Sequence, residues 1–442
     1  MAKECTLTLS TSEGGGDEGK YRSVAGDPIS IVANLEAVVA AMHRGKRRSF
    51  RTAALEIWLR AQVLLANLLV WFLRVSQFRN QRLAETDFRQ IVVYTVGILG
   101  DNVVMLPALA ALRKRYPRAA ITVITNCQEW GSAAVHGLFG ESQFVDQYFV
   151  VNDSLLRRCG LRFILDRSRL ADLRCDLFVN LSPFGNRGWL GAVVREIMLA
   201  KMLRSSHAVG FRVSNVMRSP YNRNVYPNLL KNEPRRAAEV LKPLGIAPLA
   251  WQEAMPVQSE ARESIRLKLA SLGLIDAPFA VLHPGAKFLT QRWPARRFGL
   301  LAKSLLQEYG LHTIITGTKE EMPIVDEVLV AAGYTAQSLA QRTTISELTE
   351  LLRMAKLCVS NDTGTMHLAA AVAVPTVAVF SMRNTLVHWF PNSENIRAVF
   401  RTCACRYCGL ENTGCAGVEC LNGIGVDDVM RAVRQLLSHA KF

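Results

Sequence analysis

The sequence predicts an α/β protein built from two consecutive domains, each with a parallel sheet. Buried strand patterns alternate with helix patterns from residue 89 onward, and this alternation is typical of βαβ units. Residues 248–256 have the composition of a linker between two such series. The length of 442 residues suits two domains, and an apolar content of 50% supplies material for more than one core.

The first domain is expected to span residues 89–252. Four apolar runs predict its strands, at 91–96, 119–125, 144–151 and 176–182. A helix at 103–117 connects the first two strands, so they should lie parallel in one sheet. Residues 183–250 carry many Arg and Asn residues and give no clear element pattern.

The second domain is expected to span residues 253–442. A strand with its following loop is predicted at 279–286 and again at 311–318, a strand leading into a turn at 356–362, and a further strand at 374–380. Its predicted helices lie at 295–310, 345–355 and 425–437, with an alanine-rich helix after residue 362. The repeated alternation again predicts a parallel, doubly wound sheet.

Residues 1–88 differ in composition from both domains. Residues 1–30 are polar and glycine-rich, and a disordered tail is expected there. Residues 31–88 are expected to form a basic and apolar helical extension, whose segment 54–78 is mainly apolar. Residues 43–82 carry nine Lys or Arg residues against one acid, which favours an anchor on an anionic membrane surface. A buried or partner-packing helix and a membrane span stay open as alternatives.

The net charge of +16 points to anionic partners, such as nucleic acid, a membrane surface or a phosphorylated ligand. No apolar segment of a cleavable signal peptide occurs within residues 1–30, so a cytoplasmic location is expected. Near the end of the chain a cysteine cluster predicts either a zinc site or unpaired thiols. Its members are Cys403, Cys405, Cys408, Cys415 and Cys420.

The loop at 97–102 follows the first strand of the first domain. It has neither the dinucleotide-binding glycine pattern nor the P-loop pattern. Asp101 is expected either to cap the following helix or to present a carboxylate at the mouth of the sheet. Gly97, Gly100 and Asn102 lie in the same loop.

The turn Asn361-Asp362-Thr363-Gly364-Thr365 leads from a buried strand into the alanine-rich helix. Asp362 or Thr363 is expected to cap this helix. The amides of Gly364, Thr365 and Met366 would then point toward a ligand, an arrangement that binds phosphate oxygens. His367, in the first helical turn, is either a packed core residue or a contact to phosphate or ribose.

The segment HPGAKFLTQRWPARRF, residues 283–298, adds cations beside a second loop. Lys287 and Arg292 are the candidates for phosphate binding, because Arg binds oxyanions through two parallel hydrogen bonds. Arg296 and Arg297 have the simpler interpretation of a solvated helix face.

Together these motifs resemble glycosyltransferase family 9, the lipopolysaccharide heptosyltransferase family. Three stretches carry the match, in the order of the family: GILGDNVVMLPALAALRKRYPRAAITVIT, HPGAKFLTQRWPARRF and SNDTGTMHLAAAVAVPTVAVF. The resemblance implies a GT-B fold, with the acceptor bound mainly by the first domain and a nucleotide-sugar donor by the second. It also implies inverting transfer of a sugar to a hydroxyl of a lipopolysaccharide or other glycan, without a metal or other cofactor, at the inner face of a bacterial membrane.

The resemblance also implies roles for single residues. Asp101 matches the family's essential aspartate, a general base or a group that orients the acceptor hydroxyl. Asp362, Thr363, Gly364 and His367 match the donor-binding turn. Gln291 stands where many members have lysine, so Arg292 or Lys287 must supply part of the charge on the donor phosphates. Thr365 stands where members often have Pro or another small or apolar residue.

Two other functions stay open at this point. A GT-B nucleotide-sugar epimerase would need no acceptor. A basic nucleic-acid-binding protein would explain the charge, but the sequence has no aromatic stacking array and no known binding module. The sequence does not determine the sugar, the nucleotide base or the acceptor.

Overall fold

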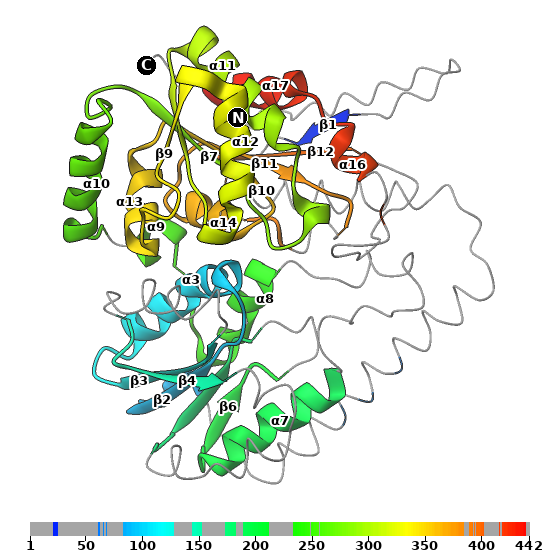
Figure 1. The fold of residues 1–442 in the computed structure, drawn as a ribbon. Helices are drawn as coiled ribbons and strands as arrows, with labels where there is room; N and C mark the ends of the chain where they lie inside the picture. The colour runs from blue at the N-terminus through cyan, green and yellow to red at the C-terminus, as the bar shows by residue number, and fades with distance from the viewer. Residues whose placement is uncertain are drawn as a thin grey trace, which may run out of the picture.

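The computed structural model describes a defined part of the chain. The longer described ranges are 83–127, 144–152, 173–182, 189–211, 233–247, 249–255, 257–383, 389–391, 395–401 and 418–438. Residues 21–24 and the single positions 61, 65, 68, 393 and 415 are described as well. These residues form two lobes, one above the other in Figure 1, and each lobe is built around one sheet.

The first lobe contains a five-stranded sheet of order β4-β3-β2-β5-β6, in which all neighbouring strands are parallel. Its strands are β2 (Gln90–Tyr94), β3 (Ala120–Cys127), β4 (Gln147–Asn152), β5 (Leu177–Asn180) and β6 (His207–Val209). Its described helices are α3 (Leu99–Arg115), α7 (Trp189–Met202) and α8 (Glu233–Val240), with 3-10 turns η1 (Leu83–Glu85) and η3 (Lys242–Leu244). The four predicted strands and the first helix are confirmed, and α7, β6 and α8 lie in the region that gave no pattern.

The second lobe contains a seven-stranded sheet of order β1-β12-β11-β10-β7-β8-β9. Its parallel strands are β7 (Phe279–His283), β8 (His312–Ile315), β9 (Ala336–Ser338), β10 (Leu357–Asn361), β11 (Thr376–Phe380) and β12 (Ile396–Arg401). The described helices around it are α10 (Ser259–Ser271), α11 (Ala295–Tyr309), α12 (Met322–Ala332), α13 (Ile345–Met354), α14 (Gly364–Ala371), α16 (Glu419–Asn422) and α17 (Val426–Leu437). The 3-10 turns are η4 (Leu289–Gln291), η5 (Lys319–Glu321) and η6 (Gly333–Thr335).

Both sheets have the strand order of doubly wound α/β domains, with the first strand of each lobe at the centre and crossovers in both directions. Such sheets bind ligands at the carboxyl ends of their strands, where the strand order changes direction. In the first lobe this point lies beside β2, and in the second it lies between β7 and β10.

The edge of the second sheet carries a strand from the N-terminal tail. β1 (Tyr21–Val24) pairs antiparallel with β12, with Tyr21 opposite Arg401 and Val24 opposite Ala398. The expectation of a disordered tail is therefore wrong for these four residues. The pairing covers an edge that would otherwise expose unpaired backbone groups. The other residues of the predicted tail lie outside the described part of the chain.

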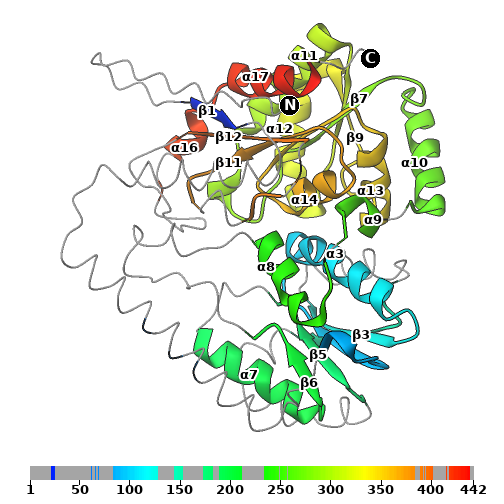
Figure 2. The ribbon, with the colours of Figure 1, turned by 180° about the vertical axis from the view of Figure 1, so that it is seen from behind.

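The two lobes pack directly on each other through α3, α14 and the short helix α9 (Trp251–Ala254). Figures 1 and 2, which are opposite views, both show α3 at the top of one lobe, facing α14 and α9. Trp251 and Ala254 of α9 are buried in the same apolar core as Leu109 of α3 and Leu368 of α14. The predicted linker therefore holds a helical turn that is packed between the domains.

Most of the predicted extension at 31–88 lies outside the described residues. Ala61, Leu65 and Leu68 are described as helical and exposed, and their spacing places them on one helix face. No helix within the described ranges has the length and apolar content that a membrane crossing requires.

Candidate active site between the two domains

The first turn of α3 holds Asp101 at the carboxyl end of β2. The helix begins at Leu99, earlier than the predicted start at 103, so Asp101 is its third residue. Asp101 Oδ2 accepts a hydrogen bond of 2.7 Å from the backbone N–H of Ile98. This bond belongs to a capping arrangement at a helix start, so the predicted structural role of Asp101 is confirmed. Its catalytic role stays a prediction.

The neighbours of Asp101 fix the loop that carries it. An added Cβ at Gly97 would clash with the Asp101 side chain, so glycine is required there. Asn102 is fully buried, donates to the Ile98 carbonyl at 3.1 Å and accepts from the Thr95 hydroxyl at 3.4 Å. Asn102 therefore ties the loop to the end of β2 rather than facing an acceptor.

The turn between β10 and α14 presents a helix N-terminus with an unusual cap. The N-cap residue is Thr363, in an extended conformation and without a side-chain cap hydrogen bond, so the alternative of Asp362 as the cap is wrong. Thr363 Oγ1 is shielded from solvent and finds no hydrogen-bond partner among the described residues. A buried hydroxyl without a partner among the described residues therefore lies next to the helix start, where the first amides of a helix lack intrahelical partners.

Asp362 is held by Gln291, the residue that stands where the family pattern has lysine. Gln291 Nε2 donates to Asp362 Oδ2 at 3.0 Å and lies 3.4 Å from the Asp362 carbonyl oxygen. Gln291 is buried, at 6% exposure. A neutral amide therefore orients this carboxylate without neutralising it.

Asn361, at the end of β10, joins three segments of the site. It is fully buried, and its Nδ2 donates to the carbonyls of Pro284 at 2.7 Å and Gly285 at 3.2 Å. Its Oδ1 accepts from the Trp293 backbone N–H at 3.0 Å. The Asn361 side chain thus fixes the loop after β7 against the turn between β10 and α14. The sequence motifs did not indicate this role.

Residues that follow β8 also contact the end of β7 and the loop after it. His283 Nδ1 lies 3.1 Å from Thr316 Oγ1, and His283 Nε2 lies 4.0 Å from Glu321 Oε2. Burial lowers the pKa of His283 below its usual value, against the opposing effect of Glu321. An added Cβ at Gly285 would clash with the Glu321 carboxylate, so the close approach of these segments depends on glycine.

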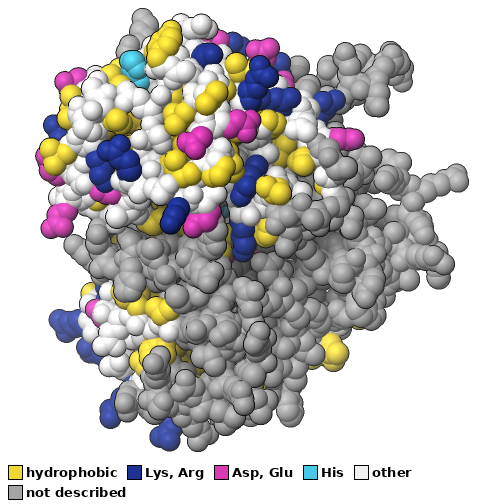
Figure 3. Space-filling view, in the orientation of Figure 1, with side chains coloured by type: hydrophobic (Ala, Val, Ile, Leu, Met, Phe, Trp, Pro, Cys, Tyr) yellow, Lys and Arg dark blue, Asp and Glu magenta, His cyan; other side chains and the backbone are white. Residues whose placement is uncertain are grey.

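The predicted cations of this region have different surroundings. Lys287 is exposed, and its ammonium lies 5.4 Å from the centre of the Phe288 ring. Arg292 is half-buried, and its Nε donates to the Ala286 carbonyl at 2.8 Å. Arg297 donates to the carbonyls of Ile424 and Leu421, so it supports the chain before α17 instead of lying in solvent as expected. Lys and Arg side chains, with acidic ones among them, follow the edge of the upper lobe that faces the lower lobe (Figure 3).

The starts of α3 and α14 meet across the domain boundary. An added Cβ at Gly100 would lie 2.9 Å from His367 Cδ2, and one at Gly364 would lie 2.9 Å from Leu99 Cγ. Both glycines therefore permit a contact that a side chain would prevent. The positive ends of two helix dipoles lie close together here, which favours an anion beside them.

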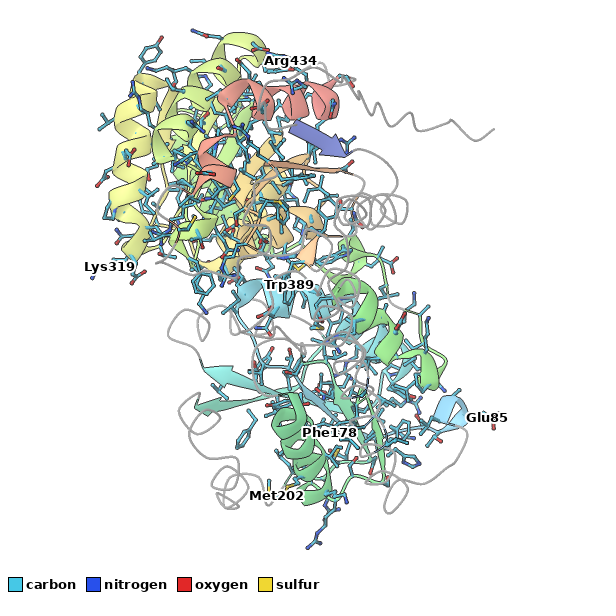
Figure 4. All side chains as sticks on the ribbon, turned by 90° about the vertical axis from the view of Figure 1, so that its right-hand side faces the viewer. Glu85, Phe178, Met202, Lys319, Trp389 and Arg434 are labelled. Atoms are coloured by element: carbon cyan, nitrogen blue, oxygen red, sulfur yellow. The ribbon has the colours of Figure 1, made fainter. Side chains whose placement is uncertain are left out.

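His367 lies at this meeting point. It is 3% exposed, its Nδ1 has no hydrogen-bond partner within the described part of the chain, and burial lowers its pKa to about 4. Its ring packs edge-on against Trp389, with 6.3 Å between ring centres. Trp389 lies beside the boundary between the lobes in Figure 4. The neutral imidazole thus brings an unsatisfied nitrogen to the site.

Most of the cysteine cluster lies outside the described residues. Cys403, Cys405 and Cys408 lie outside the described residues, and Cys415 and Cys420 form no disulfide. Within the described ranges, no group of three or more His, Cys, Asp or Glu side chains is placed to hold a metal ion.

Two doubly wound domains, with helix starts that meet at the boundary between them, have the architecture of the GT-B fold. Solved structures agree with this fold. A family 9 glycosyltransferase from Veillonella parvula matches with a TM-score of 0.59 at 19% identity, over 81% of this chain and 99% of that chain. The ADP-heptose lipopolysaccharide heptosyltransferase II of E. coli matches with a TM-score of 0.54 at 19% identity, over 80% and 100%.

The sequence comparisons identify the family. The profile of glycosyltransferase family 9 (heptosyltransferase) matches residues 198–412. Lipopolysaccharide heptosyltransferase 3 of Escherichia coli K12 is 25% identical over 305 residues, which cover 67% of this chain and 83% of the relative. Lipopolysaccharide heptosyltransferase 2 of Salmonella typhimurium is 32% identical over 138 residues, or 30% and 38% of the two chains. These matches confirm the resemblance to glycosyltransferase family 9 that the motifs predicted.

Proposed function

We propose that this glycosyltransferase moves a heptose from an ADP-activated donor to a hydroxyl of a lipopolysaccharide core, with inversion at the anomeric carbon. The start of α14 carries the proposal, because Thr363 Oγ1 and His367 Nδ1 are both buried there without a partner among the described residues. Buried polar atoms are normally paired, so two such atoms at a helix start favour a ligand that supplies the partners. The names of the relatives support the choice of sugar and acceptor.

The donor diphosphate is proposed to bind at the α14 start, with the second domain holding the nucleotide. The amides of Gly364, Thr365 and Met366 and the Thr363 hydroxyl would donate to its oxygens. Charge grows on the leaving diphosphate as the glycosidic bond breaks, and fixed donors stabilise that charge without reorganising. Lys287 and Arg292 are proposed to add positive charge from the loop after β7. In this proposal no metal ion is needed.

Asp101 is proposed to act on the acceptor from the first domain. The acceptor hydroxyl would attack the anomeric carbon on the face opposite the diphosphate, and the carboxylate would take the proton late in the step. The capping bond from Ile98 fixes the orientation of this side chain, which favours a repeatable approach to the hydroxyl. Contact between Leu99 and Gly364 lets the two domains exclude water around the donor.

The enzyme is further proposed to act as a peripheral protein on the cytoplasmic face of the inner membrane. The exposed apolar residues Leu65 and Leu68 and the basic composition of 43–82 support this location. A chain lacking residues 1–82 should no longer sediment with anionic phospholipid vesicles, while the full chain should. Equal sedimentation of both would contradict the anchor.

Calorimetric titration with ADP, UDP, GDP and CDP tests the proposed donor site. One nucleoside diphosphate, expected to be ADP, should bind the full chain with clear preference. Gly364→Val should abolish this binding, because the added side chain would press on Leu99 and displace the helix start that carries the amides.

A double variant separates these two effects. Leu99→Ala with Gly364→Ala relieves the clash between the domains while still adding a Cβ at the helix start. Weak binding by this double variant supports a diphosphate at the amides. Full recovery of affinity would mean that Gly364 serves domain packing only, and failure of all four nucleotides to bind the wild-type chain would contradict the proposed function.

A further inference from the structure

The backbone that leaves β5 in the first domain is held by a buried ion pair of α8. Arg236 Nε donates to Glu233 Oε2 at 2.6 Å, and the two side chains are 3% and 0% exposed. Arg236 Nη2 also donates to the carbonyls of Leu181 at 2.9 Å and Ser182 at 3.1 Å. One guanidinium therefore binds a carboxylate and two consecutive backbone carbonyls.

The other backbone groups of these two loop residues are paired as well. The Leu181 N–H donates to the carbonyl of Tyr94, at the end of β2, at 2.9 Å. The Ser182 N–H donates to Asn180 Oδ1 at 3.1 Å, and Asn180 Nδ2 donates to Glu196 Oε2 of α7 at 2.7 Å. Each backbone N–H and C=O of the two residues thus has a partner, which fixes the start of the loop.

This loop lies where a doubly wound sheet binds its ligands. The chain adds β3 and β4 on one side of β2 and then β5 and β6 on the other, so the strand order changes direction between β2 and β5. The loop after β2 carries Asp101, and Asn102 in that loop bonds to Thr95 at the end of the strand. The loop after β5 is therefore the neighbour of the Asp101 loop at the carboxyl edge of the sheet.

Stability alone does not require charges at this position. Moving two charges out of water is costly, and well-packed apolar side chains often stabilise a fold equally well. The guanidinium adds defined geometry, because its planar N–H groups point in fixed directions. α8 packs against α3, the helix whose first turn holds Asp101, so the ion pair sets the loop after β5 relative to that residue.

We propose that the Arg236–Glu233 ion pair is a positioning element of the acceptor site, which holds the loop after β5 in place for a glycan acceptor beside Asp101. This inference rests on the proposed function, because it assigns how the first domain orients the acceptor of that reaction. Arg236 acts through the backbone of residues 181 and 182, not through the donor. Its loss should therefore raise the KM of the acceptor and leave ADP affinity unchanged.

The test measures steady-state transfer from ADP-heptose to truncated lipopolysaccharide, together with calorimetric ADP binding by the same full-length proteins. Arg236→Lys keeps a positive charge beside Glu233 but lacks the planar set of N–H groups that reaches the carboxylate and both carbonyls. The KM of the acceptor should rise about 10-fold, the effect of a lost hydrogen bond to a charged group, whereas kcat should change by a smaller factor.

A second variant removes the ion pair without leaving a buried charge. Glu233→Leu combined with Arg236→Met replaces both charges by apolar side chains, so the fold should be preserved. The acceptor KM of this double variant should rise at least as much as that of Arg236→Lys, with ADP affinity again unchanged.

Arg113→Lys is the matched control in the same domain. Arg113 is also a helix arginine that bonds to a carboxylate and a carbonyl, those of Asp146 at 2.6 Å and Ala119 at 2.7 Å. These contacts lie at the amino ends of β4 and β3, away from the ligand-binding edge, so the acceptor KM should not change.

Two results would overturn the inference while the proposed function stands. One is a wild-type acceptor KM in both variants of the ion pair, and the other is an equal rise of this KM in Arg113→Lys. If the wild-type chain transfers no heptose, the proposed function fails and the inference fails with it.

Discussion

Thr363 and Thr344 each begin a helix of the second domain, and they use their hydroxyls differently. Thr344 Oγ1 accepts a hydrogen bond of 3.2 Å from the Glu347 backbone N–H, and the Glu347 carboxylate accepts one from the Thr344 N–H, so α13 has a complete capping box. Thr363 makes no such bond at α14, and its hydroxyl oxygen is buried. A cap that does not stabilise its own helix is available for a ligand.

This difference gives a paired prediction. Thr363→Val should leave the free energy of unfolding within about 0.5 kcal/mol of wild type, because no hydrogen bond within the described residues is lost. It should weaken nucleoside diphosphate binding about 10-fold or more, the effect of one hydrogen bond to a charged group. Thr344→Val should show the reverse, with a stability loss of about 1 kcal/mol and unchanged affinity. Denaturant unfolding and calorimetry measure both, and a strongly destabilised Thr363→Val would contradict the ligand role.

His367 gives a prediction for the dependence of stability on pH. Burial lowers its pKa from 6.5 to about 4, so between these values the unfolded chain binds a proton that the folded chain does not. The free energy of unfolding should therefore fall as the pH drops from 6.5 to 4, by about 3 kcal/mol for this residue. His367→Gln should reduce the slope over this window. Identical slopes in the two proteins would show that His367 titrates normally in the fold.

At the scale of elements, β10 organises the site because its last residue bonds to two other segments. Asn361→Ala removes hydrogen bonds to the Pro284 and Gly285 carbonyls and from the Trp293 N–H, and leaves these buried groups unpaired. The free energy of unfolding should fall by about 2 to 4 kcal/mol. Nucleotide affinity should also fall, because the loop after β7 loses its hydrogen bonds to residue 361. Ser360→Ala is the neighbouring control, since its hydroxyl bonds to the adjacent Asn361 carbonyl, and its effect should be smaller. Equal effects of the two substitutions on nucleotide affinity would contradict the role of Asn361 in positioning the loop after β7.

The elements also show which features can be predicted from sequence. Strands such as β7, β10 and β11 were predictable because every residue in them is buried, which gives short, mainly apolar runs. The start of α3 was placed too late, because its first turn contains Gly100 and is stabilised by Asp101 from within the helix. β1 could not be predicted, because a four-residue strand depends on the edge of β12 for its pairing.

Contacts between distant residues hold together the parts of the site that the sequence left unassigned. Gln291 was recognised as a departure from the family pattern, but its bond to Asp362 joins residues 71 positions apart and has no local signal. The contact between the Arg383 guanidinium and the Phe288 ring also has no local signal, because it depends on the strand order. The turn into α14 was predictable because small and polar residues that directly follow a buried strand are typical of a ligand-binding turn, although only the structure assigns its cap to Thr363.

At the scale of the whole molecule, two sheets present their carboxyl ends to one boundary, where the starts of α3 and α14 meet. Asp101 lies on one side of this boundary and the α14 amides lie on the other. In the proposed mechanism the first domain activates the acceptor and the second binds the donor. Sugar transfer then requires both halves together, with Asp101 as the group that receives the proton.

The most direct test is the rate of heptose transfer from ADP-heptose to truncated lipopolysaccharide, measured for wild type and Asp101→Asn together with ADP affinity. Asparagine retains an oxygen that can accept the bond from Ile98, so folding and ADP binding should be preserved. Transfer should fall by about 100-fold or more, the usual contribution of a general base. Unchanged transfer by Asp101→Asn would contradict the proposed mechanism, because Asp101 would then serve only to cap α3.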